Sequence, residues 1–140
     1  MMDKHIAAIV GMPGAGKSEV AACFEQHRYR VVRFGDATEE ELTRRGLPLN
    51  EANERVVREQ LRAEHGMAAY AKLNIPRIDD AVRATDVVVD GLYSWEEYLA
   101  LKQQYGNQLI VVAVMASPGT RRKRLAARPR RPLTAEEVDS

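Results

Sequence analysis

The sequence is poor in cysteine and in aromatic residues. Cys23 is the single cysteine among 140 residues, so no disulfide can form within the chain and no cysteine cluster can hold a metal ion. This usage favours a reducing compartment, and we expect a cytoplasmic location. Aromatic residues make up only 6% of the chain, so a core must be built mainly from aliphatic side chains. Cys23 itself is expected to pack in that core.

Long hydrophobic runs are missing as well. No apolar segment approaches the roughly 20 residues that a membrane-spanning helix needs, and no secretory signal precedes the first apolar run, residues 5–10. We therefore expect no membrane contact. The length predicts one domain over residues 1–140, large enough to bury its own core.

Acidic residues are absent from one long stretch of an otherwise balanced chain. The formal net charge is +1, yet no aspartate or glutamate lies between Tyr98 and Ala135. A local basic cluster on a chain that is acidic elsewhere favours a discrete anionic ligand and makes general nucleic-acid binding unlikely. The basic residues of the stretch are Lys102, Arg121, Arg122, Lys123, Arg124, Arg128, Arg130 and Arg131.

Short β-branched runs alternate with longer helical patterns, which is typical of an α/β fold with a parallel sheet. Thr38 is a candidate helix cap, and Pro76 predicts a kink or a break after Asn74. The predicted strands are residues 5–10, 30–34, 86–90 and 108–115. Predicted helices cover residues 17–27, 38–45, 50–65 and 67–84, with two more beginning at Ser94 and Ser117.

A glycine-rich segment at residues 11–18 carries the clearest chemical signal. It matches the pattern G-x-x-x-x-G-K-[ST] in full, directly after a predicted strand and before a predicted helix. Such a loop wraps its backbone around phosphate oxygens, while Lys17 reaches the β- and γ-phosphates and the Ser18 hydroxyl binds Mg²⁺. The alternative to a phosphate-binding loop is an ordinary glycine turn with an exposed lysine.

Further motifs follow the loop in a fixed order. Phe34-Gly35-Asp36 ends the second predicted strand, Asp90-Gly91 ends the third, and Ala116-Ser117-Pro118 precedes the basic helix. Together with the loop, they resemble the nucleoside-monophosphate-kinase-like branch of P-loop proteins over the entire chain. The sequence is similar to adenylate kinases and dephospho-CoA kinases, and most closely to an uncharacterised prokaryotic kinase-like family related to both. The resemblance implies a three-layer α/β/α fold whose sheet has four or five strands in the order 2-3-1-4(-5).

The resemblance also implies roles for individual residues. Asp90 would bind Mg²⁺ together with Ser18, and Asp36 would face the phosphoryl acceptor. Lys17, Arg124 and Arg128 would be catalytic. The alternatives are a turn aspartate at Asp90, a turn residue or helix cap at Asp36 and solvated surface charge at the arginines. The expected nucleotide-binding set is Gly11, Pro13, Gly14, Ala15, Gly16, Lys17, Ser18 and Glu19.

Three functions are compatible with these motifs. The first is an ATP-using, Mg²⁺-dependent kinase that acts on a nucleoside monophosphate or dephospho-CoA. The second is a nucleotide-binding switch or degenerate homologue, favoured because Leu92-Tyr93-Ser94 stands where adenylate kinases usually carry an arginine. The third is a nucleic-acid-associated ATPase, which the lack of interleaved aromatic residues in the basic stretch disfavours.

The end of the chain carries one more expectation. Residues 134–137 form a capping box, yet the sequence stops at Ser140, so we expect either that the sequence is a fragment or that the domain lacks a C-terminal strand and helix. The strand predicted at residues 108–115 would then lie at an exposed sheet edge. Such an edge tends to pair with another chain, so we expect a homodimer through this edge, or else low solubility and weak turnover for want of a complete lid.

Overall fold

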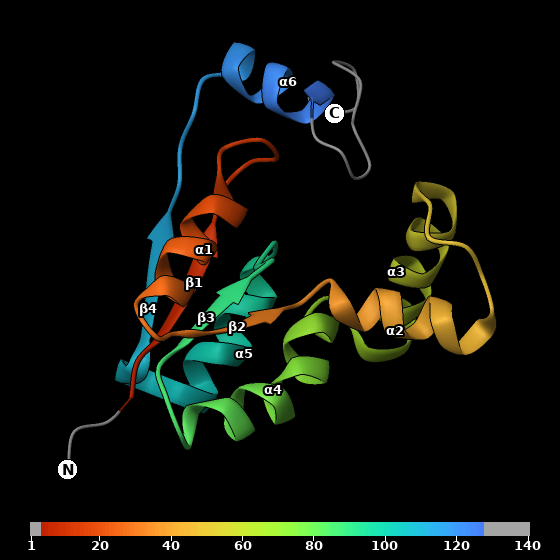
Figure 1. The fold of residues 1–140 in the computed structure, drawn as a ribbon. Helices are drawn as coiled ribbons and strands as arrows, with labels where there is room; N and C mark the ends of the chain where they lie inside the picture. The colour runs from red at the N-terminus through yellow and green to blue at the C-terminus, as the bar shows by residue number, and fades with distance from the viewer. Residues whose placement is uncertain (1–3, 128–140) are drawn as a thin grey trace.

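Four parallel strands form the centre of the molecule in the computed structural model, which describes residues 4–127 (Figure 1). The strand order is β2-β3-β1-β4, and every neighbouring pair is parallel. The predicted sheet and strand order are therefore confirmed for these four strands. Their bounds are β1 Ile6–Val10, β2 Arg30–Arg33, β3 Val87–Asp90 and β4 Leu109–Ala113.

The two inner strands are apolar because both of their faces are covered. Ile6 of β1 pairs with Val87 of β3 on one side and with Leu109 of β4 on the other. Ile6 and Val87 are fully buried. The register aligns the carboxyl ends of the strands at one edge of the sheet, where ligands of open α/β sheets bind.

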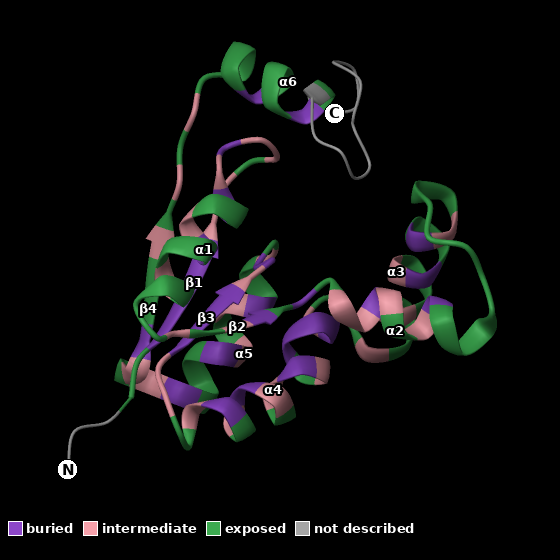
Figure 2. Cartoon of the chain, viewed as in Figure 1, coloured by how far each residue is buried: buried purple, intermediate pink, exposed green. Residues whose placement is uncertain are grey.

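Helices cover both faces of the sheet, so the domain has three layers. Helices α4 (Ala69–Val82) and α5 (Trp95–Tyr105) pack on one face, where Phe34, Ile78 and Leu101 are buried together. Helix α1 (Lys17–Gln26) packs on the other face through a smaller cluster. Figure 2 shows the buried residues concentrated on the inner strands β1 and β3 and on the helix sides that face the sheet.

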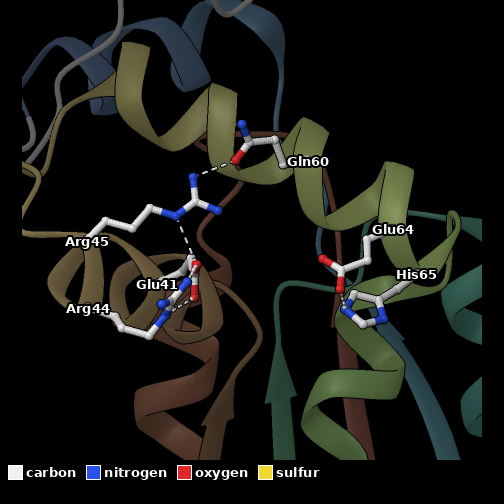
Figure 3. A network of polar contacts seen from close by, with 6 residues as sticks. All are labelled: Glu41, Arg44, Arg45, Gln60, Glu64 and His65. Atoms are coloured by element: carbon white, nitrogen blue, oxygen red, sulfur yellow. Dashed lines mark hydrogen bonds and ion pairs between the residues drawn. The ribbon is translucent and has the colours of Figure 1, made fainter.

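Helices α2 (Asp36–Arg45) and α3 (Glu51–His65) project from one side of the sheet as a pair (Figure 1). Arg45 joins them, because its guanidinium donates to Glu41 at 2.9 Å within α2 and to the Gln60 side chain of α3 at 2.5 Å (Figure 3). Arg44 and Arg45 lower the pKa of Glu41 to about 2 by hydrogen bonding. The two helices are thus joined by surface hydrogen bonds as well as by their packing against each other.

Local capping explains where several helices begin. Asn50 accepts a hydrogen bond from the Asn53 backbone at 2.8 Å, and Ser94 accepts one from the Glu97 backbone at 3.1 Å. The helix start predicted at Ser94 is therefore confirmed. Ser117 likewise accepts from the Thr120 backbone at 3.2 Å, before α6 (Pro118–Ala127). A short 3₁₀ turn, η1 (Gly106–Gln108), leads into β4.

Two local expectations are wrong, those for Thr38 and Cys23. Thr38 does not cap α2, which begins two residues earlier, because its hydroxyl is buried against the Tyr70 hydroxyl at 2.5 Å. Helix α4 runs through Pro76 without a break, and a kink at that position stays a prediction. Cys23 is exposed because it lies on the outer side of α1 and not against the sheet. Within residues 4–127, no helix is long and apolar enough to cross a membrane.

Candidate functional site

The phosphate-binding motif forms a tight loop between β1 and α1. Gly14 and Gly16 have φ angles of 81° and 105°, a left-handed conformation that favours glycine. The Ala15 N–H donates to the Met12 carbonyl at 3.1 Å and closes the turn. Backbones that alternate in this way direct successive N–H groups to one side, which forms an anion-binding concavity at the helix start. The loop is thus shaped for phosphate, as its sequence predicts.

Lys17 is folded onto the loop itself. Its Nζ donates to the Gly11 carbonyl at 2.6 Å and lies 4.9 Å from the centre of the Tyr93 ring. Only 9% of Lys17 is exposed, whereas 64% of Tyr93 is exposed. The ammonium group therefore sits at the mouth of the loop, covered by an aromatic ring that solvent can reach.

Two aspartates follow neighbouring strands: Asp90 is the last residue of β3 and lies within range of the Lys17 charge, and Asp36 is the first residue of α2, just after β2. Burial raises the pKa of Asp90, the positive charges of Lys17 and Arg33 lower it, and Asp36 raises it further. Burial also raises the pKa of Asp36, with Glu39 adding to the rise and Arg33 opposing it. Each carboxylate therefore lies in a partly dehydrated site where a cation would stabilise its charged form.

Helix α6 lies across the outer side of the phosphate loop (Figure 1). The Arg124 guanidinium donates to the carbonyls of Gly14 at 3.3 Å and Ala15 at 3.1 Å. Arg121, which is buried, donates to the Pro13 carbonyl at 3.4 Å. A Cβ atom on Gly14 would lie 2.6 Å from the Arg121 carbonyl oxygen, so glycine allows this close approach. Arg124 is thus held beside the loop, whereas Arg128 lies outside the described residues.

The residues around the loop fit ATP and Mg²⁺. Glu19 and Ser18 lie in the exposed first turn of α1, directly after Lys17. Among residues 4–127, no group of three or more histidine, cysteine or acidic residues could hold a metal ion by itself. A P-loop magnesium ion does not need such a group, since a serine, an aspartate, phosphate oxygens and water complete its shell. The pairing of Ser18 with Asp90 stays a prediction.

Some residues of the site could not be assigned from the sequence. Tyr93 was noted only as part of a departure from adenylate kinases, yet it covers Lys17. Arg33 directly precedes the Phe34-Gly35-Asp36 motif, and that position is the signal that could have indicated it. Arg77 comes from α4, and no sequence pattern links it to the strand ends. Arg33 and Arg77 both act on the Asp36 carboxyl.

Comparison with known proteins places the chain in a family. Residues 8–140 match the family described as "AAA domain". A UPF0200 protein of Thermococcus onnurineus (strain NA1) is 39% identical over 127 residues, which span 89% of this chain and 69% of that protein. A UPF0200 protein of Thermococcus kodakarensis is 36% identical over 138 residues, which span 96% of this chain and 75% of that protein. The chain belongs to the UPF0200 family.

Solved structures resemble this UPF0200 protein in fold. TT1252 from Thermus thermophilus has a TM-score of 0.60 and 26% identity. The match covers 98% of this chain and 78% of the TT1252 chain. A gluconokinase from Sinorhizobium meliloti 1021 has a TM-score of 0.58 and 16% identity, with coverage of 99% and 73%. A shikimate kinase from Bacteroides thetaiotaomicron has a TM-score of 0.53 and 16% identity, and the match covers 90% of this chain and 65% of the shikimate kinase. The UPF0200 chain therefore has a P-loop kinase-like fold, while a specific kinship with adenylate or dephospho-CoA kinase stays a prediction.

Proposed function

We propose that this UPF0200 protein is an ATP- and Mg²⁺-dependent kinase that transfers the γ-phosphoryl group to a small nucleotide or nucleotide-like acceptor. A nucleoside monophosphate and dephospho-CoA are the two acceptors to test first. One observation carries the proposal. Two partly buried carboxylates lie close together near the phosphate loop: Asp90 ends β3 within range of the Lys17 charge, and Asp36, the first residue of α2, lies within range of Asp90.

The two carboxylates support transfer better than nucleotide binding alone. Binding a nucleotide requires the loop, Lys17 and one carboxylate for the cation. Nucleotide binding does not require a second dehydrated carboxylate such as Asp36, whereas in a kinase this carboxylate would orient an acceptor oxygen. Burying a carboxyl group costs stability unless a ligand restores its interactions, and this cost supports a functional role.

The chain's own groups would divide the work as follows. The loop N–H groups and Lys17 hold the β- and γ-phosphates, and Arg124 stabilises charge near the bridging oxygen. Asp36 orients the acceptor oxygen in line with the γ-phosphorus. The bond from γ-phosphorus to the bridging oxygen breaks as the bond to the acceptor oxygen forms, and ADP leaves. Where the acceptor oxygen belongs to a hydroxyl group, its proton passes to the Asp36 carboxylate. Bound between Ser18, Asp90 and the phosphates, Mg²⁺ would neutralise the charge that develops on the phosphate oxygens.

A nucleotide-dependent switch is the second candidate. The segment Leu92-Tyr93-Ser94 offers no arginine after Asp90-Gly91, and the Tyr93 ring lies against Lys17. A switch would bind or hydrolyse ATP or GTP without a metabolite acceptor. It would also change conformation between its triphosphate and diphosphate states.

A coupled assay of ADP release separates the two candidates. ATP and Mg²⁺ are supplied first alone and then with each acceptor of a panel that contains nucleoside monophosphates and dephospho-CoA. A kinase releases ADP in proportion to an added acceptor and yields its phosphorylated product. A switch releases ADP slowly and at a rate that no acceptor changes.

A further inference from the structure

The turn between β3 and α5 carries an aromatic side chain to which the proposed mechanism gives no role. Tyr93 follows Asp90 closely, at the carboxyl end of an inner strand. The residue is exposed, yet the centre of its ring lies 4.9 Å from the Nζ atom of Lys17, which is buried. An exposed ring therefore covers the charge of the phosphate loop.

The Tyr93 ring packs against the backbone at the end of β3. Gly91 has a φ angle of 113°, a conformation that favours glycine. A Cβ atom on Gly91 would lie 3.6 Å from Cε2 of Tyr93 and 3.2 Å from the Cβ atom of Phe34, which is buried. A larger residue at Gly91 would thus disturb the place where the ring rests. The position of the ring is tied to the strand that also carries Asp90.

A buried carboxylate fixes the backbone of the same turn. Oε1 of Glu97 accepts a hydrogen bond from the Tyr93 N–H at 3.2 Å and another from the Ser94 hydroxyl at 3.0 Å. Glu97 is fully buried, and burial raises the pKa of its carboxyl group while these bonds lower it. Burying a carboxylate costs stability unless its oxygens are bonded. Both bonds to Oε1 come from the turn that presents Tyr93, so this turn is held rigidly.

A ring face suits an ammonium group that must also bind phosphate. The Lys17 Nζ already donates to the Gly11 carbonyl at 2.6 Å. An aromatic face attracts the same positive charge through its quadrupole, without an oxygen that competes for the N–H donors as a carbonyl does. The ring can therefore hold the ammonium in place while phosphate oxygens approach it.

We propose that Tyr93 is a positioning residue of the phosphate loop, whose ring holds the Lys17 ammonium where the β- and γ-phosphates bind. The inference deepens the proposed function and rests on one part of it, the binding of a nucleoside triphosphate by Lys17. Without the ring, Lys17 spends part of its time in rotamers that do not face the phosphates. The affinity for the triphosphate then falls in proportion to the fraction of Lys17 that is correctly placed.

A blocking role is the alternative for the same contact. A ring that draws Lys17 away from the phosphates would act as an autoinhibitory cover, and its removal would strengthen nucleotide binding. Loss of a positioning ring weakens nucleotide binding. The two roles therefore predict opposite effects of one substitution.

Calorimetric titration of the full chain with a non-hydrolysable ATP analogue and Mg²⁺ decides between them. We expect Tyr93→Leu to weaken binding about 2–5-fold, because the aromatic face is lost. Tyr93→Phe keeps the ring and should bind like the parent. Trp95→Leu is the matched control with parent affinity, since Trp95 is also exposed but its ring stacks on Tyr98, with 5.0 Å between the ring centres.

A double-mutant cycle tests whether Tyr93 acts through Lys17. The cycle uses denaturant unfolding of the nucleotide-free chain, which stays measurable where a variant no longer binds nucleotide. Tyr93→Leu should raise the unfolding equilibrium constant about 2–5-fold in the parent and leave it unchanged in Lys17→Met, where no charge remains for the ring to hold. A purely structural role of Tyr93 gives equal effects in both backgrounds.

Four results would overturn the inference. Analogue binding that Tyr93→Leu leaves unchanged or strengthens is the first pair. The others are a phenylalanine variant that binds as weakly as the leucine variant, and equal effects of Tyr93→Leu on unfolding in the parent and in Lys17→Met. Failure of the proposed function looks different. In that case no acceptor stimulates ADP release by the parent protein, while the titration with the analogue still reports on Tyr93.

Discussion

At the scale of single residues, Lys17 combines burial with a charge that must reach a ligand. Its Nζ is bonded to the Gly11 carbonyl and covered by Tyr93, so the ammonium is held at the loop by two contacts. A phosphate group would replace the carbonyl by a stronger, charge-assisted partner. Lys17 is therefore placed to contribute a large part of the binding energy for the triphosphate.

We predict that Lys17→Ala removes productive binding of ATP–Mg²⁺ while the domain stays folded. The side chain contacts a loop and an exposed ring, not the aliphatic core, so Tm should change little. Lys17→Met keeps the apolar stem and serves as a control for packing. Calorimetry with ATP–Mg²⁺ and a thermal melt are the measurements. Parent-like affinity in the alanine variant would refute the phosphate-loop assignment.

Burial of Asp90 affects both the stability of the fold and the expected binding of Mg²⁺. Burial raises its pKa above the ordinary value of 3.8, so folding takes up protons as the pH falls towards that range. The group contributes most to stability below its unfolded pKa, and that contribution is lost as the pH rises through the raised value. At neutral pH the charged carboxylate is therefore a cost that a bound cation would offset.

We predict that Asp90→Asn raises Tm at pH 7 by about 3 °C and abolishes the Mg²⁺ dependence of nucleotide binding. The gain in Tm should shrink as the pH approaches 3.8 and below, because the parent carboxyl is then protonated too. Ser18→Ala should lose Mg²⁺ dependence without the gain in stability. A Tm difference that does not vary with pH would show that burial of the charge is not its cause.

At the scale of elements, α6 is fastened to the phosphate loop by arginine side chains. Arg121 is buried under the helix, whereas Arg124 is exposed and donates to two loop carbonyls. Exposed contacts contribute little to folding. A charge held beside the site of phosphoryl transfer can contribute several orders of magnitude to the rate.

We predict that Arg124→Ala lowers turnover at least 100-fold and shifts Tm by less than about 2 °C. Lys123→Ala, on the same helix and also exposed, is the control and should keep parent turnover. Steady-state kinetics with a thermal melt test both expectations. Arg128→Ala is expected to act in the same direction. If neither arginine variant alters the kinetics, these side chains are solvated surface charge.

Strands and capped helix starts were more predictable than features that depend on long-range contacts. The apolar runs around β1 and β3 indicate buried parallel strands, since only strands covered on both faces have such sequences. The position of the phosphate loop followed from its glycines. The start of α2 could not be predicted from the sequence. The Thr38 hydroxyl bonds to the Tyr70 hydroxyl, and this contact exists only once α4 packs on the sheet. Arg77 reaches the Asp36 region for the same tertiary reason.

At the scale of the whole molecule, β4 is an edge strand with apolar side chains in solvent. Ile110 is 46% exposed and Val111 44%, and the register places them on opposite faces of the sheet. The order β2-β3-β1-β4 leaves the outer side of β4 without a partner strand among residues 4–127. An edge of this kind is a template for pairing with another chain.

We predict that the 140-residue chain self-associates through β4. Val111→Lys should shift the protein towards monomer, since a lysine on an edge strand opposes pairing. Light scattering over a range of protein concentrations gives the mass. Arg30→Lys on the opposite edge is a control that leaves association unchanged. A parent chain that is monomeric at every concentration contradicts the prediction.

The measurement that tests the central claim most directly is acceptor-dependent release of ADP by the parent chain, with Lys17→Ala as the blank. The account predicts that a small nucleotide or nucleotide-like acceptor stimulates ADP release from ATP, that the phosphorylated acceptor appears in equal amount, and that Lys17→Ala loses both. ATP hydrolysis at one unchanged rate with every acceptor, and with no phosphorylated product, would contradict the claim that this fold carries a kinase.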